Sequence, residues 1–158
     1  MNAHAVQAVS IDALRQRVGQ EIGVSSWHVI DQGVIDRFGD VTCDRQFIHV
    51  DPAQAAADAP FGGTIAHGFL TLSLLSVMAQ QALPPIQGRR MGINYGFDRV
   101  RFVSPVRSNA RIRGRFVLAG VNHRSPREVA LRYRVTVEIE GEAKPALAAE
   151  WMTLAVLG

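Results

Sequence analysis

The stretch from Gly68 to Leu83 constrains the fold more than any other, because almost every side of the helix it predicts is apolar. Its large apolar residues are Leu70, Leu72, Leu74, Leu75, Val77 and Met78. A helix without a polar face must be enclosed by other parts of the protein. The stretch is also too short and too rich in serine, threonine and glutamine to span a membrane, so we expect no membrane association.

The segments that follow this helix have the period of two that is typical of β-strands. They comprise residues 92–106, 111–121, 131–141 and 146–156. The third alternates most regularly, with one apolar face made of Leu131, Tyr133, Val135, Val137 and Ile139. Short turns between the segments predict antiparallel pairing, and such a sheet needs its apolar face covered. We therefore expect a single α+β domain over residues 1–158, an antiparallel sheet wrapped around the long central apolar helix, which is the hotdog architecture.

Capping residues predict short elements in the N-terminal part of the chain. Ser10 suits the N-cap of a short helix that Gly19 ends, and residues 24–30 are predicted to form a strand. Asp31 is expected to cap a second helix, and Asp51, followed by proline, opens a further one. The buried side of the second helix consists of Val34, Ile35 and Phe38.

Composition excludes several classes of protein. The 158 residues are 47% hydrophobic and 20% charged, as in an ordinary globular domain. The net charge of +3 comes almost entirely from arginines, which are spread over several elements, so we expect no nucleic-acid partner. One cysteine, Cys43, excludes an internal disulfide, and no CxxC pair indicates zinc or redox chemistry. The N-terminus lacks a signal-peptide pattern, so a cytoplasmic location is expected.

The candidate catalytic groups lie in FGDVTCDRQFIHVDP, residues 38–52, where charged residues bracket an apolar run. Because Phe47, Ile48 and Val50 draw this segment inward, we expect Asp44 and His49 to be carried into a cleft. Asp36, Asp40 and Asp51 are interpreted as residues at helix ends. The residues alone leave an alternative open, in which Asp44 caps a surface helix and His49 lies at the edge of the core. No metal is expected here, even with His67 nearby, because the spacing matches no zinc pattern.

At this point the chain resembles the MaoC-type dehydratases, the (R)-specific enoyl-CoA hydratase branch of the hotdog superfamily. It is most similar to the subgroup that includes nodulation-protein-N-like proteins and mycobacterial (R)-hydratases. The resemblance runs from about Val18 to Leu157, and its specific parts are DRQFIHVDP, IAHGFLTLSLLS, INYGFDRVRFVSPV and EGEAKPALAAE. Three residues depart from the hydratase motif: Cys43 replaces a glycine, Gln46 an asparagine and Phe47 a proline.

The resemblance implies a role for each of several residues. Asp44 and His49 fall on the motif's aspartate and histidine, and would hold a water that adds to C3 of a trans-2-enoyl-CoA while C2 receives a proton, giving (R)-3-hydroxyacyl-CoA. Gly68 would donate its backbone N–H to the thioester oxygen, and Ser76 would hold the Asp44 carboxylate. From the helix alone, Ser76 could equally bond the carbonyl four residues earlier. His67 is interpreted as a structural donor that fixes the loop before Gly68.

The same resemblance implies a homodimer and an acyl-CoA substrate, with no cofactor apart from the CoA that the substrate carries. Residues Ile93 to Phe97 are the candidate apolar edge for pairing of two sheets. CoA phosphates require positive charge, so we expect at least one of Arg99, Arg101 and Arg107 to contact the nucleotide. Alternatively, these arginines are solvated or paired with Glu138 and Glu140.

Two other functions stay open from the sequence. A hotdog acyl-CoA thioesterase would place an acidic residue on the central helix, and residues 68–83 contain none. A non-catalytic protein that binds acyl thioesters would keep the fold without turnover, and the presence of both Asp44 and His49 argues against it. Acyl chain length, and CoA as against acyl carrier protein, are not set by these residues.

Overall fold

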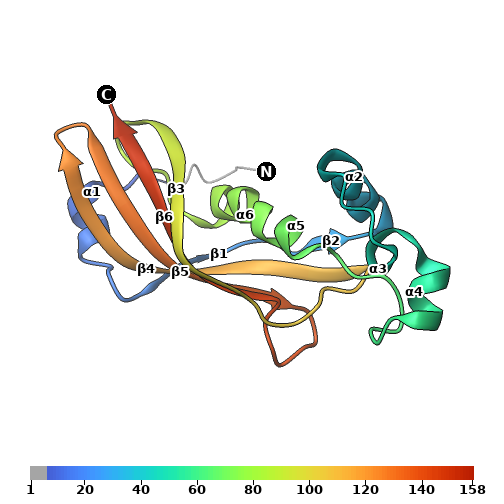
Figure 1. Cartoon of the computed structure of the whole chain (residues 1–158). Coiled ribbons are helices and arrows are strands. Elements are labelled where there is room, and N and C mark those ends of the chain that lie inside the picture. The colour runs from blue at the N-terminus through green and yellow to red at the C-terminus, as the bar shows by residue number, and fades with distance from the viewer. Residues whose placement is uncertain (1–6) are drawn as a thin grey trace, which may run out of the picture.

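The computed structural model describes residues 7–158, in which one antiparallel sheet curves around a pair of short helices (Figure 1). The strands are β1 (Glu21–Val24), β2 (His28–Ile30), β3 (Arg89–Phe102), β4 (Ala110–Ser125), β5 (Glu128–Ile139) and β6 (Leu147–Leu157). Their order in the sheet is β1-β4-β5-β6-β3, and β2 also pairs with β4. Every pairing between these strands is antiparallel. Short turns correctly predicted the β4–β5 and β5–β6 pairs, but β3 pairs with β6 and not with β4, the next strand along the chain.

The helices are α1 (Ile11–Arg15), α2 (Gln32–Thr42), α3 (Phe47–Val50), α4 (Pro52–Asp58), α5 (Gly68–Ser73) and α6 (Leu75–Ala82). Three of these helices, α1, α2 and α4, begin at the predicted capping residues, but α1 ends at Arg15, before the predicted end at Gly19. Ser10 accepts a hydrogen bond from the Ala13 N–H at 3.1 Å, and Asp31 accepts one from the Val34 N–H at 2.8 Å. Each cap satisfies an N–H group that has no partner within its own helix.

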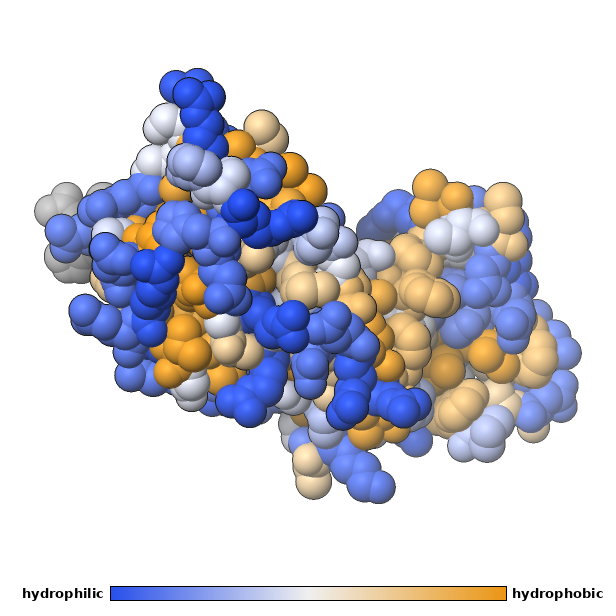
Figure 2. Space-filling model, turned by 60° about the vertical axis from the view of Figure 1, so that its left-hand side comes forward, coloured by the Kyte–Doolittle hydropathy of each residue, from blue (hydrophilic) through white to orange (hydrophobic). Residues whose placement is uncertain are grey.

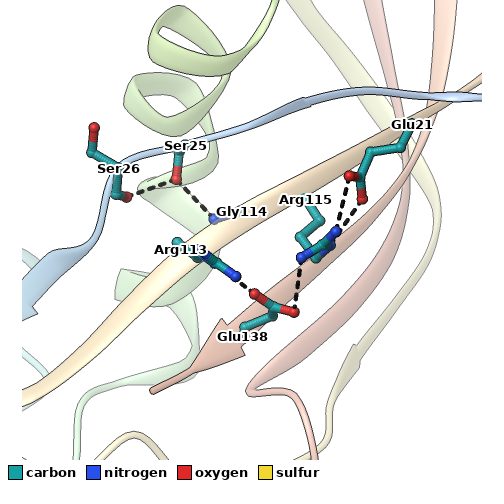
Figure 3. Close-up of polar contacts among 7 residues, drawn as sticks. All are labelled: Glu21, Ser25, Ser26, Arg113, Gly114, Arg115 and Glu138. Atoms are coloured by element: carbon teal, nitrogen blue, oxygen red, sulfur yellow. Dashed lines mark hydrogen bonds and ion pairs between the residues drawn. The ribbon is translucent and has the colours of Figure 1, made fainter. Parts of the chain in front are cut away.

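The strand predicted over residues 24–30 is two strands, β1 and β2, separated at Ser25–Trp27. The Ser25 hydroxyl accepts a hydrogen bond from the Gly114 N–H at 2.9 Å and donates one to the Ser26 carbonyl, also at 2.9 Å (Figure 3). This side chain therefore takes over part of the hydrogen bonding of β4 at the point where the strand is interrupted.

The central helix is likewise divided, into α5 and α6, with Leu74 between them. The hydroxyl of Ser73 donates to the Phe69 carbonyl four residues earlier at 2.7 Å, a bond that competes with the helical hydrogen bond and bends helices. The helix pair is not fully enclosed in the single chain, since the Phe69 side chain is 66% exposed. The prediction of one continuous, fully covered helix is therefore wrong in this detail.

The core lies between α6 and the concave face of the sheet. Leu75 and Met78 of α6 are buried, and so are the inward residues of β5 that alternated in the sequence. Two glycines permit this close packing. A methyl group at Gly23 would overlap the Ala82 carbonyl oxygen, and one at Gly114 would lie 3.1 Å from the Met78 sulfur.

The opposite face of the sheet carries a ladder of ion pairs (Figure 3). Arg113 bonds Glu138 at 2.6 Å, and Arg115 bridges Glu21 at 2.8 Å and Glu138 at 3.4 Å. Arg111 pairs with Glu140 at 2.8 Å. Exposed pairs of this kind stabilise a fold by about 1 kcal/mol at most, but they fix which arginines Glu138 and Glu140 bind.

A small lobe made of α2, α3 and α4 extends beyond the end of β2, apart from the curved sheet (Figure 1). Ile35 of α2 is fully buried, whereas Val41 near the end of the same helix is exposed. Within residues 7–158, no helix has both the length and the apolar character needed to cross a membrane.

Candidate active site

The lobe brings the predicted catalytic pair together with a second histidine. Asp44 lies between α2 and α3, His49 lies in α3, and His67 directly precedes α5. One oxygen or nitrogen atom from each of the three side chains lies within 4.8 Å of the other two. Asp44 is partly exposed, whereas both imidazole rings are buried. The inward placement of His49 that the apolar residues Phe47, Ile48 and Val50 predicted is therefore found.

His49 has one ring nitrogen, Nε2, that forms no hydrogen bond with any residue from 7 to 158. Its Nδ1 lies 2.7 Å from the Ile65 carbonyl oxygen, and because a carbonyl only accepts, Nδ1 carries the proton. In the neutral ring, Nε2 is then an acceptor and can act as a base. Burial lowers the pKa of His49 below its usual value, and nearby His67 lowers it further, while the Ile65 carbonyl and Asp44 oppose the shift.

His67 packs face to face with His49, which the sequence did not predict. The two ring centroids are 3.8 Å apart and the planes are inclined by 24°. The Nε2–H of His67 donates to the backbone carbonyl of Asp44 at 2.8 Å, so its interpretation as a loop-fixing donor is consistent with this bond. Its Nδ1 is buried and has no hydrogen-bond partner within residues 7–158.

Gly68 is the first residue of α5, so its N–H has no partner within the helix. The ring of Phe102 lies against its Cα, and a methyl group at this position would be 2.9 Å from a Phe102 ring carbon. A side chain at position 68 would therefore clash with Phe102 as well as restrict access to the Gly68 N–H. Gly68 directly follows His67, so the chain links this amide to the group of Asp44, His49 and His67.

Asp40 and Asp51 lie near helix ends, as predicted, but Asp36 lies in the middle of α2 and not at a helix end. Asp40 forms an exposed ion pair with Arg45 at 2.7 Å, and Asp51 accepts the Gln54 N–H at the start of α4. Asp36 accepts a hydrogen bond from Gln32, whose side-chain nitrogen also donates to the His49 carbonyl at 2.7 Å. Gln32 thus holds the backbone of His49. The carboxylate that lies beside the His49 ring is that of Asp44.

The ligand atoms of Asp44, His49 and His67 all lie within 4.8 Å of one another, so the three residues could hold a metal ion. Two of their ring nitrogens, His49 Nδ1 and His67 Nε2, already bond backbone carbonyls. The expectation of a site without metal stays a prediction.

Ser76 does not bond Asp44 in this chain. Its hydroxyl instead accepts a hydrogen bond from the Asn94 side chain at 3.2 Å. Ser76 lies two helical turns beyond Gly68, a distance of about 12 Å along an ideal helix axis. It lines a cavity of about 780 Å³ between α6 and the strands, together with Asn94, Tyr133 and Trp151. The predicted contact is corrected because the hydroxyl faces β3 and not the loop that carries Asp44.

The three candidate arginines are exposed and form no ion pair within residues 7–158. Their alternative pairing with Glu138 and Glu140 is wrong, because both glutamates are held by other arginines. Arg107 lies nearest to the site, since its backbone pairs with Ile65, whose carbonyl binds His49. Arg99 and Arg101 lie on β3, and Arg101 adjoins the Phe102 that packs on Gly68.

Comparison with known proteins identifies the family. The family model described as a MaoC like domain matches residues 13–139, most of the chain. The chain belongs to the MaoC-like dehydratase family. It is 56% identical to nodulation protein N of Rhizobium meliloti over 147 residues, 93% of this chain and 91% of that protein. It is also 44% identical to the 3-hydroxyacyl-thioester dehydratase Z of Mycobacterium tuberculosis over 141 residues, covering 89% of this chain and 92% of that protein.

A solved structure agrees with this assignment. The unliganded R-hydratase PhaJ1 from Pseudomonas aeruginosa superposes with a TM-score of 0.66 at 27% identity, over 89% of this chain and 83% of that one. The predicted membership and the predicted α+β hotdog fold are confirmed, and the expected long central helix is consistent with the pair α5 and α6. One departure from the MaoC-like motif also has a structural explanation. Cys43, in place of the motif glycine, has a left-handed φ of 59°, a conformation that glycine adopts without strain.

Proposed function

We propose that this MaoC-like protein adds water to trans-2-enoyl-CoA thioesters to give (R)-3-hydroxyacyl-CoA, and catalyses the reverse dehydration. The observation that carries the proposal is the meeting of Asp44 with His49, whose Nε2 is free to act as a base. The relative named as a 3-hydroxyacyl-thioester dehydratase supports the same class of reaction. A CoA substrate would place this activity in the cytoplasm.

In the proposed reaction, one water lies between the Asp44 carboxylate and His49 Nε2. As the water oxygen bonds to C3, the proton that it releases passes to Nε2, and the C2–C3 double-bond electrons move toward the thioester carbonyl. The same proton then returns from Nε2 to C2 on the face where oxygen has added, so the enzyme ends unchanged. Asp44 orients the water and stabilises the transient imidazolium by its charge.

The Gly68 amide is assigned the stabilisation of the enolate-like oxygen. It is the first N–H of α5, and partial positive charge gathers at such a helix start. A preorganised donor of this kind acts mainly on the charge that develops in the transition state. Ser76 and the cavity of about 780 Å³ beside α6 are then assigned to the acyl chain rather than to Asp44.

We further propose that two copies of the chain pair through β3. This strand is at the end of the sheet order, so one of its edges has no strand partner within residues 7–158. Large apolar side chains on it are exposed: Met91, Ile93, Tyr95 and Phe97. Figure 2 shows apolar side chains at the surface between hydrophilic ones on one face of the molecule. Pairing of two such edges would cover a surface that is otherwise prone to aggregation.

A thioesterase is less well supported, because α5 and α6 carry no carboxylate that could direct water to the carbonyl carbon. A protein that binds acyl thioesters without turnover would not require the Asp44 and His49 pair. The exposed Arg99, Arg101 and Arg107 are assigned to the phosphates of CoA, which guanidinium groups bind well.

The test follows the loss of enoyl absorbance with crotonyl-CoA and then resolves the chirality of the product. Asp44→Asn and His49→Ala should each lower kcat by about 10²–10⁴-fold, the range for loss of an acid–base group. Asp40→Asn is the matched control, because Asp40 is exposed and pairs only with Arg45. If Asp44→Asn keeps most of the wild-type activity, or if the product is the (S) enantiomer, the proposed function is wrong.

A further inference from the structure

One buried histidine has no part in the proposed reaction. The His67 ring is 2% exposed and lies between His49 and Phe38, whose ring centroid is 5.1 Å away. Its Nδ1 is buried without a partner, an arrangement that destabilises a fold. Phenylalanine would fill the same space without an unsatisfied acceptor. The imidazole is therefore expected to do something that an apolar ring cannot.

The hydrogen bonds of the two stacked rings fix their tautomers. Both rings donate to backbone carbonyls, His67 from Nε2 to Asp44 and His49 from Nδ1 to Ile65. Each neutral ring therefore keeps one bare nitrogen. If one ring gains a proton, the other is opposed in doing so, because two cations would face each other at 3.8 Å away from water.

We propose that His67 is a positioning residue, which fixes the Asp44 backbone through Nε2–H and, by stacking on His49, favours the neutral base form of His49. This inference rests on the proposed function of Asp44 and His49. The direction of the His49 pKa agrees with the geometry, since burial and then His67 lower it. His67 would thus help His49 to remain an uncharged base as the pH falls.

The charged groups around His49 are otherwise accounted for. On α2, Asp36 accepts a hydrogen bond from Gln32, and Asp40 pairs with Arg45. Asp51 caps α4, and Arg107 contributes its backbone to the pairing with Ile65. Asp44 and His67 are thus the charged or titratable groups that act directly on the His49 ring.

Two substitutions separate the two parts of this role. In His67→Gln, the amide nitrogen can still donate to the Asp44 carbonyl, but no second ring remains to be protonated. In His67→Phe, a stacked ring remains, but the donor and the titratable nitrogen are both lost, so the comparison with His67→Gln isolates the donor. His28→Gln is the control, because His28 lies on β2 and bonds Gln81, away from the site.

The first measurement is an NMR titration of the histidine side chains in the protein without substrate. In the wild type, His67 should be the neutral Nε2–H tautomer and His49 the Nδ1–H tautomer. In His67→Gln, the pKa of His49 should rise, and in His28→Gln it should not change. An unchanged His49 pKa in His67→Gln would overturn the electrostatic part. The wild-type tautomers test the two hydrogen bonds, and so the positioning part, even if a variant does not fold.

The second measurement is the pH dependence of kcat/KM with crotonyl-CoA. The acidic limb for His67→Gln should move to higher pH, with activity at high pH close to that of the wild type. His67→Phe should lose about 10²-fold in kcat at every pH with little change in KM, because Asp44 is no longer fixed. Wild-type kcat in His67→Phe would refute the positioning of Asp44. A wild type that hydrates no enoyl-CoA would refute the proposed function instead, while the titration would still decide the coupling of the rings.

Discussion

Gly68→Ala separates the role of this residue in packing from its role at the thioester oxygen. The added methyl group would meet three ring carbons of Phe102 at 2.9 to 3.0 Å. Overpacking of this kind costs about 1–3 kcal/mol, and alanine in place of glycine in a helix returns about 1 kcal/mol. The Phe102 side chain is 49% exposed and can move aside. We therefore expect a net loss of roughly 0–2 kcal/mol, which a folded domain tolerates.

Activity should fall much more than stability does. The same methyl group stands beside the N–H that the thioester oxygen is proposed to approach, and loss of one such donor costs about 10²–10³-fold in kcat. Urea unfolding gives the stability change, and turnover of crotonyl-CoA at saturating concentration gives the change in kcat. The expected result is a folded protein with a small shift in its unfolding midpoint and a large loss of hydratase activity.

Phe102→Leu supplies the matched control, because a smaller side chain relieves the overlap but leaves the Gly68 N–H unchanged. The single variant should stay active. In the double variant Gly68→Ala with Phe102→Leu, stability should return toward that of Phe102→Leu alone, and activity should not return. If the double variant recovers both, Gly68 matters only for packing, and the thioester oxygen is bound elsewhere.

The arginines and the edge strand give two further predictions. Among Arg99→Gln, Arg101→Gln and Arg107→Gln, at least one should raise KM for CoA esters with little change in kcat, and the effect should shrink as salt rises, because exposed charges are screened. If KM is unchanged in all three at low salt, the nucleotide is bound elsewhere or the carrier is not CoA. Sedimentation should show a dimer for the wild type and a monomer for Ile93→Lys, with Val29→Lys at an exposed position on β2 as control. A wild-type monomer at micromolar concentration that hydrates substrate would contradict the pairing.

Helix caps and the alternation of strand residues could be predicted from the sequence, because both depend on residues close together in the chain. Capping by Ser10, Asp31 and Asp51 depends on residues three positions apart, and the structure forms all three caps. The alternation of β5 also needed no tertiary information, because a strand with one buried face can only place side chains in that order. The sheet followed from the same pattern together with short turns.

What the sequence did not predict depends on contacts between distant residues. The interruption after β1 arises because Ser25 bonds Gly114, which lies 89 positions away in the chain. The stacking of His67 on His49 depends on how two loops pack, and no spacing rule contains it. Ser76 was assigned to Asp44 through the family resemblance, but its partner in this chain is Asn94. A polar side chain within an apolar helix predicts that it has a hydrogen-bond partner, but the sequence does not identify that partner.

The segment before α5 explains how the Gly68 amide and the His49 ring, which come from different parts of the chain, are held relative to one another. The Ile65 N–H donates to the Ile48 carbonyl at 2.9 Å, and the Ile65 carbonyl accepts from the His49 ring at 2.7 Å. On the other side, the Ala66 N–H donates to the Val106 carbonyl at 2.7 Å. Residues 64–67 therefore join the helical lobe to the turn between β3 and β4, and Gly68 follows directly. The distance between the base and the Gly68 amide is thus set by backbone hydrogen bonds, which substitutions of side chains at the surface of the lobe leave in place.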